Sequence, residues 1–91
     1  MVFGHVKKDW EERGFSCASW TDLPGQQWKN FVHEDDELLM LQEGTIEVTF
    51  QGSTIRPQVG EEIYIPAGAM HTVRNVGNTH SRWLYGYRQK R

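Results

Sequence analysis

Three side chains of the types that bind transition metals occur in a suggestive pattern: His33, Glu37 and His71. Neutral imidazoles and carboxylates are common ligands of divalent transition-metal ions. His33 ends an extended segment and Glu37 opens an apolar run, so the acidic residues 34–36 between them predict a turn. If this turn closes a hairpin, His33 and Glu37 are cross-strand neighbours with Cβ atoms about 5 Å apart.

Glu37 and His71 are both expected to point toward the core. On a strand, Glu37 shares its face with Leu39 and Leu41, and His71 shares its face with Val73. A buried, unpaired carboxylate needs a cation or strong hydrogen bonds. Spacing alone leaves the ordinary alternative open, because a strand histidine is usually a core or surface group and an acidic run is usually a solvated turn.

The elements that must position these residues are predicted to be strands. Turn signals recur at intervals of roughly 8–12 residues, a spacing that favours a sandwich or barrel over alternating strands and helices. Ile46, Val48 and Phe50 alternate with polar residues, as in a half-buried strand. We expect an all-β single domain, with residues 1–14 as an N-terminal arm or helical turn and residues 15–91 as a β-barrel.

Composition excludes several functional classes. The 91 residues carry a net charge of −2, which provides no basic field for nucleic acid. No stretch approaches the roughly 20 apolar residues that span a bilayer. Residues 1–13 lack the apolar core and cleavage site of a secretory signal. We therefore expect a cytoplasmic protein that binds neither nucleic acid nor membrane.

The segment from Gly25 to Asn75 resembles the paired motifs of the cupin superfamily. The first motif is glycine, five residues, His-x-His, three or four residues, Glu, six residues and glycine. Its matched positions are Gly25, His33, Glu37 and Gly44. The second is glycine, five residues, Pro-x-Gly, two residues, His, three residues and Asn, matched throughout by Gly60, Pro66, Gly68, His71 and Asn75.

Segments 13–17, 20–26 and 82–87 are similar to small, single-domain bacterial cupins of mostly undefined function. The resemblance implies a jelly-roll-like cupin β-barrel, and a homodimer that packs strands from two barrels.

One departure from the first motif changes the implied site. Cupins with the full set usually hold a divalent metal with three His and one Glu, but the first histidine is Phe31 here. The remaining ligands, His33, Glu37 and His71, form the facial set that suits non-haem Fe(II) and leaves positions open. The same set accepts Fe, Mn, Ni or Zn. Phe31 would form an apolar pocket wall, and we expect Trp83 and Tyr85 to line the same pocket.

Two functional hypotheses follow from this resemblance. The first is a metal-dependent enzyme, dioxygenase-like or isomerase-like, that acts on a small molecule. The alternative is a non-catalytic module that binds or senses a small ligand or a metal. No catalytic residue beyond the metal ligands is identified from the sequence.

Overall fold

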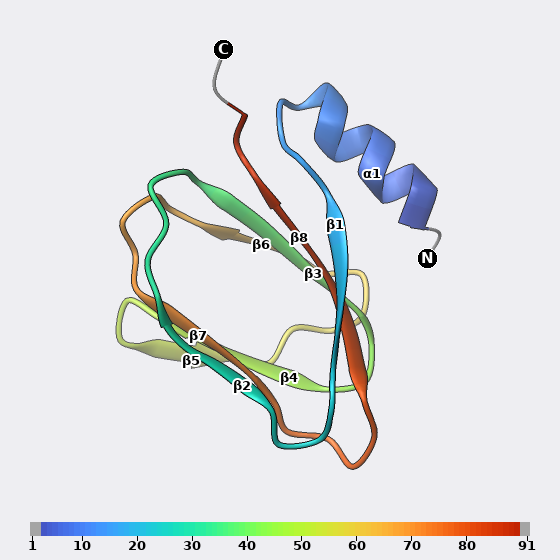
Figure 1. Cartoon of the computed structure of the whole chain (residues 1–91), viewed down its shortest axis with the longest axis vertical. Helices are drawn as coiled ribbons and strands as arrows, with labels where there is room; N and C mark the ends of the chain where they lie inside the picture. Colours follow the sequence, from blue (N-terminus) through green and yellow to red (C-terminus); the bar gives the residue numbers. More distant parts are fainter. Residues whose placement is uncertain (1–2, 90–91) are drawn as a thin grey trace.

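The computed structural model describes residues 3–89, except for the side chains of residues 30 and 31. Throughout this range, strands alternate with turns as the sequence predicts. This range contains one helix and eight strands (Figure 1): α1 (Phe3–Glu12), β1 (Ala18–Asp22), β2 (Gln27–Phe31), β3 (Glu37–Glu43), β4 (Ile46–Phe50), β5 (Ser53–Ile55), β6 (Glu62–Ile65), β7 (His71–Asn75) and β8 (Ser81–Tyr87). The prediction of an all-β domain with a short N-terminal helical element is confirmed.

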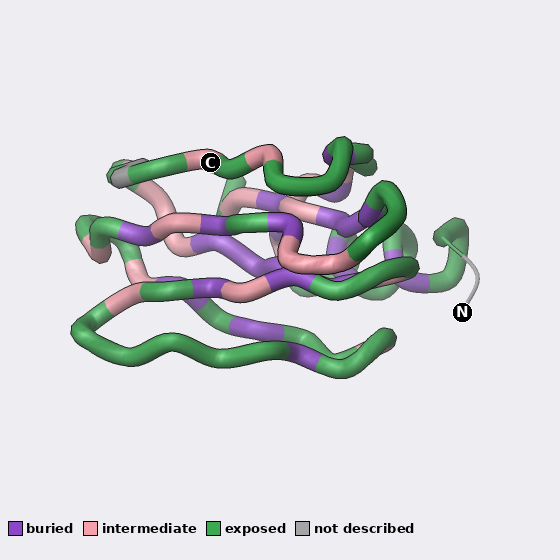
Figure 2. Tube along the Cα trace, turned by 90° about the horizontal axis from the view of Figure 1, so that it is seen from below, coloured by how far each residue is buried: buried purple, intermediate pink, exposed green. Residues whose placement is uncertain are grey.

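The strands form two four-stranded antiparallel sheets, in the orders β1-β8-β3-β6 and β2-β7-β4-β5. Figure 1 shows them as two layers, and Figure 2 shows buried segments along the strands with exposed turns around them. The main core lies between the layers. Its buried members are Leu39, Leu41, Ile63, Ile65 and Trp83 from the first sheet, and Ile46, Val48 and Val73 from the second.

Strand β3 is buried on both faces, which explains its continuous apolar run. Leu39 and Leu41 point into the core between the sheets, while Leu38 and Met40 point the other way into a second cluster. Trp10 of α1 belongs to that second cluster. A strand covered on both sides therefore reads as apolar throughout rather than alternating.

The N-terminal segment is a helix because it has an apolar face to bury. Val6 and Trp10 lie four residues apart, on one face of α1, and both are buried. The Trp10 indole donates a 2.9 Å hydrogen bond to Glu62 of β6, and Arg13 forms two 2.8 Å bonds to the same carboxylate. Gly14 has a φ of 89°, a conformation that favours glycine just beyond a helix end.

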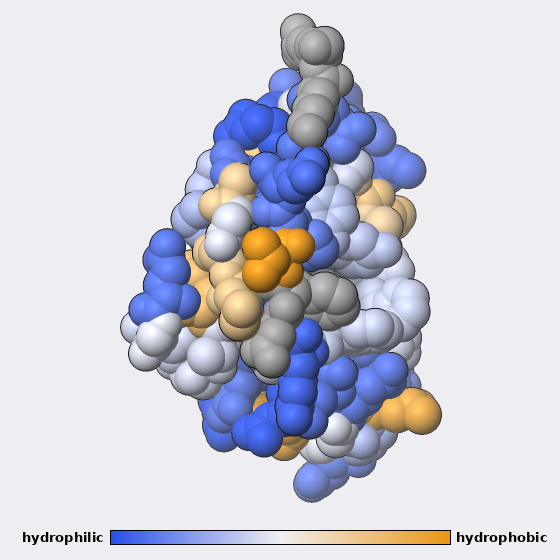
Figure 3. Space-filling model, turned by 60° about the vertical axis from the view of Figure 1, so that its left-hand side comes forward, coloured by the Kyte–Doolittle hydropathy of each residue, from blue (hydrophilic) through white to orange (hydrophobic). Residues whose placement is uncertain are grey.

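The apolar side chains on the surface are dispersed. In the described residues, four large apolar side chains are more than half exposed and lie in four separate connections: Leu23, Val32, Val59 and Met70. The face in Figure 3 is largely hydrophilic, with small separate apolar areas. Within residues 3–89, no helix has both the length and the apolar character needed to cross a membrane.

Gly86 of β8 allows the segment before β1 to pass close to the sheet. A Cβ atom at this position would lie 1.8 Å from the Ser16 carbonyl oxygen and 3.0 Å from the Trp10 ring. We predict that Gly86→Ala lowers the free energy of unfolding by about 1–3 kcal/mol or more, because backbone must move. Urea denaturation measures the change.

Gly4→Ala is the matched control, because a Cβ atom at Gly4 in α1 meets nothing within 4 Å. It should leave stability unchanged or slightly raised, since alanine favours the helix. Equal stability of the two variants would contradict this account of the packing.

Candidate metal centre

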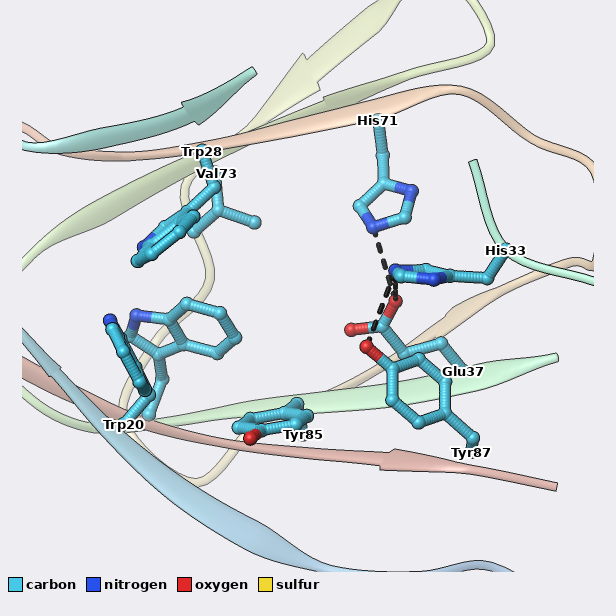
Figure 4. A pocket seen from close by; sticks show the side chains of 9 residues that line it. Trp20, Trp28, His33, Glu37, His71, Val73, Tyr85 and Tyr87 are labelled. Carbon is cyan, nitrogen blue, oxygen red and sulfur yellow. Dashed lines mark hydrogen bonds and ion pairs between the residues drawn. The ribbon is translucent and has the colours of Figure 1, made fainter. Parts of the chain in front are cut away.

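The structure brings His33, Glu37 and His71 together. One potential ligand atom from each lies within 4.8 Å of the other two. Glu37 Oε1 is 3.1 Å from His71 Nε2 and 3.5 Å from His33 Nε2 (Figure 4). Glu37 and His71 begin β3 and β7, so the two opposed sheets both supply this cluster.

The predicted hairpin between His33 and Glu37 is wrong. Strand β2 pairs with β7, whereas β3 pairs with β6 and β8. Residues 32–36 therefore cross from one sheet to the other, because the strands on either side already have partners in different sheets. His33 approaches Glu37 across the space between the sheets and not across a ladder.

Asp36 holds this crossing segment in place. The backbone N–H of Ala67 donates to Asp36 Oδ1 at 2.7 Å, and the Tyr64 hydroxyl donates to Oδ2. These bonds, the Tyr64 bond most strongly, lower the pKa of the Asp36 carboxyl. The Gly68 N–H also donates to the His33 carbonyl at 2.9 Å. Asp36, the last residue of the acidic run, thus anchors the segment that carries His33. This role was not predicted from the sequence.

A backbone carbonyl group two residues earlier in the chain orients the imidazole of His71. Its Nδ1 lies 3.1 Å from the Ala69 carbonyl oxygen. Since a carbonyl oxygen only accepts, Nδ1 carries the proton and donates, which directs Nε2 toward Glu37. This arrangement is typical of histidines that bind metal through the other nitrogen. Burial alone would lower the pKa of His71, but the contacts with Glu37 and Ala69 outweigh it and raise the pKa.

The Glu37 carboxylate fits a bound cation. It is 3% exposed, and no group in the described part of the chain donates a well-aligned hydrogen bond to Oε1. Two ligand atoms that bind one ion at about 2.0–2.2 Å lie roughly 3.0–3.5 Å apart. The two oxygen–nitrogen distances at Oε1, 3.1 and 3.5 Å, lie within about this range. The three side chains form the candidate metal site typical of cupins.

Tyr87 is a further polar group at this site. It is paired in register with Glu37, and its hydroxyl oxygen lies 3.3 Å from His33 Nε2. Burial, together with the negative charge of Glu37, raises the pKa of Tyr87 to about 12. The phenol therefore keeps its proton at neutral pH. In the sequence, the only indication that Tyr87 lies near the site was its position on the same strand face as Trp83 and Tyr85.

A cavity of about 260 Å³ adjoins the three candidate ligands. Its other described walls are Val73 and five aromatic side chains: Trp20, Trp28, Trp83, Tyr85 and Tyr87. Trp83 and Tyr85 thus line the cavity, while Trp20 and Trp28 were not singled out from the sequence. The backbone of Phe31 pairs with His71 in register. The side chain of Phe31 lies outside the described residues, so its role as a pocket wall stays a prediction.

The fold has counterparts among solved structures. Oxalate oxidase is 27% identical with a TM-score of 0.75, and the alignment covers 85% of this chain but 43% of that enzyme chain. This chain thus spans less than half of the oxalate oxidase chain. The protein TT1209 from Thermus thermophilus is 27% identical with a TM-score of 0.74, covering 84% of this chain and 74% of that one.

A conserved-barrel cupin protein from Salinispora arenicola shares the fold at 20% identity, with a TM-score of 0.70. Its alignment covers 81% of this chain and 63% of that one. A search of curated proteins found no significant match. The sequence itself matches the Cupin domain model over residues 18–87, which is most of its length and includes all three candidate ligands. The chain therefore belongs to the cupin domain family.

Proposed function

We propose that this cupin binds a divalent transition-metal ion through His33, Glu37 and His71 and uses it on a small molecule held in the adjoining cavity. The observation that carries the proposal is Glu37 Oε1, a buried oxygen without a well-aligned donor that lies between two imidazole nitrogens. Fe, Mn, Ni and Zn all accept this ligand set, and coordination geometry together with cellular supply selects among them.

When bound, a divalent ion supplies Lewis-acid polarisation of a carbonyl or hydroxyl, or activation of oxygen. The chain itself orients and encloses the bound molecule. Tyr87 retains its proton and can donate a hydrogen bond to an oxygen atom of a bound molecule. Apart from the three ligands and the tyrosine hydroxyls, the described lining offers no acid or base. Chemistry in this pocket therefore depends on the ion.

The same lack of a separate general base favours the second candidate, a module that binds its ligand without turnover. Oxygen uptake by protein loaded anaerobically with Fe(II), tested on a panel of small enolic, thiol and sugar compounds, separates the two. Consumption that disappears in Glu37→Gln supports the oxygen-dependent enzyme. Tight binding with no turnover supports the module.

Removal of a ligand should remove the metal. We predict that Glu37→Gln and His71→Ala each weaken metal binding on the order of 100-fold or more, because loss of a direct ligand exceeds the effect of losing a supporting group. Elemental analysis of protein purified without a metal-affinity tag, before and after reconstitution with Fe(II), Mn(II), Ni(II) or Zn(II), measures occupancy.

His80→Ala is the matched control, because His80 is exposed and lies 3.7 Å from Glu43 rather than at the site. It should leave occupancy unchanged. Wild-type protein that holds less than about a tenth of an equivalent after every reconstitution would overturn the metal proposal.

Metal binding should depend on pH through His71. Its raised pKa means that the metal-free protein gains stability from protonated His71 beside Glu37, fully at pH below the ordinary value of 6.5. That contribution disappears as the pH rises through the raised pKa. Since a metal needs neutral imidazole, we predict that the increase in melting temperature on adding metal grows between about pH 6 and pH 8.

Thermal unfolding of metal-free and metal-loaded protein across this interval provides the measurement. In Glu37→Gln both the metal effect and its dependence on pH should be lost. A metal-induced increase that stays constant with pH would show that His71 does not exchange a proton for the ion.

A further inference from the structure

The cavity has an aromatic end, distinct from the three metal ligands. Figure 4 shows Trp20 and Trp28 on the side away from His33 and His71, with Tyr85 between the two groups. Of the described side chains that line the cavity, none is Lys, Arg, Asn or Gln. This end therefore offers little to a carboxylate, a phosphate or a sugar, each of which needs several hydrogen-bond donors.

A buried carboxylate fixes the orientation of three tryptophan rings. Asp22 is fully buried at the end of β1, and its oxygens accept three indole N–H bonds, from Trp20 at 2.7 Å, from Trp28 at 2.8 Å and from Trp83 at 2.8 Å. An indole has one N–H donor, so these donors are bound to Asp22 and not to a ligand. The rings are thereby held in fixed orientations beside the cavity, with Trp20 and Trp28 edge to face at 5.0 Å.

The charges around the aromatic end favour a cation. No Lys, Arg or His of the described residues forms an ion pair with Asp22, so this carboxylate lies at the N–H edges of the three rings without a cationic side chain beside it. Aromatic faces are themselves negative, and indole attracts cations most strongly.

Among the described side chains at this end the Tyr85 hydroxyl is the one hydrogen-bond acceptor that lines the cavity, and this scarcity restricts the kind of cation. A primary ammonium has three N–H donors that must all be satisfied on burial. A fully alkylated ammonium has none, and its methyl groups can pack against rings. Aromatic cages recognise this group in general.

We propose that the pocket binds a small molecule with a quaternary ammonium group, seated among Trp20, Trp28 and Trp83, and with an oxygen atom directed toward His33, Glu37 and His71. The location of the ammonium follows from the rings and Asp22 alone. The direction of the oxygen rests on the metal function proposed above. This ligand differs in charge from the oxalate implied by the name of one structural relative.

The test compares choline with 3,3-dimethylbutan-1-ol, which has the same shape and hydroxyl but no charge. Isothermal titration calorimetry is carried out on the whole chain, metal-free and metal-loaded. Choline should bind at least about tenfold more tightly than the neutral alcohol in both forms. Equal affinities, tighter binding of the alcohol, or no binding of choline would overturn the proposal.

Variants of Trp20 identify the cage. Trp20 is 38% exposed, so the fold should tolerate its replacement. Trp20→Leu should reduce the preference for choline several-fold, while Trp20→Phe should retain part of it because a ring remains. Phe3→Leu, at a helix residue that is 37% exposed and outside the cavity lining, is the control and should change nothing. A preference for choline that Trp20→Leu leaves intact would contradict the assignment.

Metal content measured on the same samples separates the two proposals. Bound metal without a preference for choline would overturn the quaternary ammonium proposal and leave the metal site standing. A preference for choline that depends on Trp20, in protein that takes up no metal, would overturn the metal proposal and support the cage.

Discussion

The burial of the Glu37 carboxylate is the constraint on which the site depends. Strand β3 lies between β6 and β8 with its inner face in the core, so this side chain cannot reach solvent. A buried carboxylate costs several kcal/mol unless a cation or hydrogen bonds compensate it. His33 and His71 lie nearest to the unsatisfied oxygen, and His71 comes from the opposite sheet. The contact between His71 and Glu37 that compensates the carboxylate charge therefore also joins the two sheets.

Groups around the three ligands keep this arrangement rigid. Asp36 ties the crossing segment to the turn before β7, and the Ala69 carbonyl orients the His71 ring. On the other face of the sheet, α1 covers Leu38 and Met40. Strand β3 is thus held from both sides, which fixes the position from which Glu37 extends. The helix lies outside the cavity, yet it helps to set the geometry inside it.

Local pattern and motif spacing were sufficient to predict the all-β fold, the inward direction of Glu37 and the three candidate ligands. The link between His33 and Glu37 was mispredicted, because a short polar segment has the same composition whether it returns within a sheet or crosses between sheets. The tryptophan cluster was not predicted, because Trp83 is 61 residues from Asp22 and no periodicity relates them. Tyr87 was visible only as one member of an aromatic strand face.

The two buried carboxylates near the cavity differ in one physical respect. Asp22 accepts three well-formed indole bonds, so its burial is compensated and the rings that it holds become rigid. Glu37 retains an oxygen without a well-aligned donor, which costs about 1–3 kcal/mol or more for a charged group. The remaining compensation comes from the His71 imidazole 3.1 Å away, or from a cation that replaces the imidazole proton, so Asp22 fixes the rings that line the pocket and Glu37 offers an oxygen to an ion.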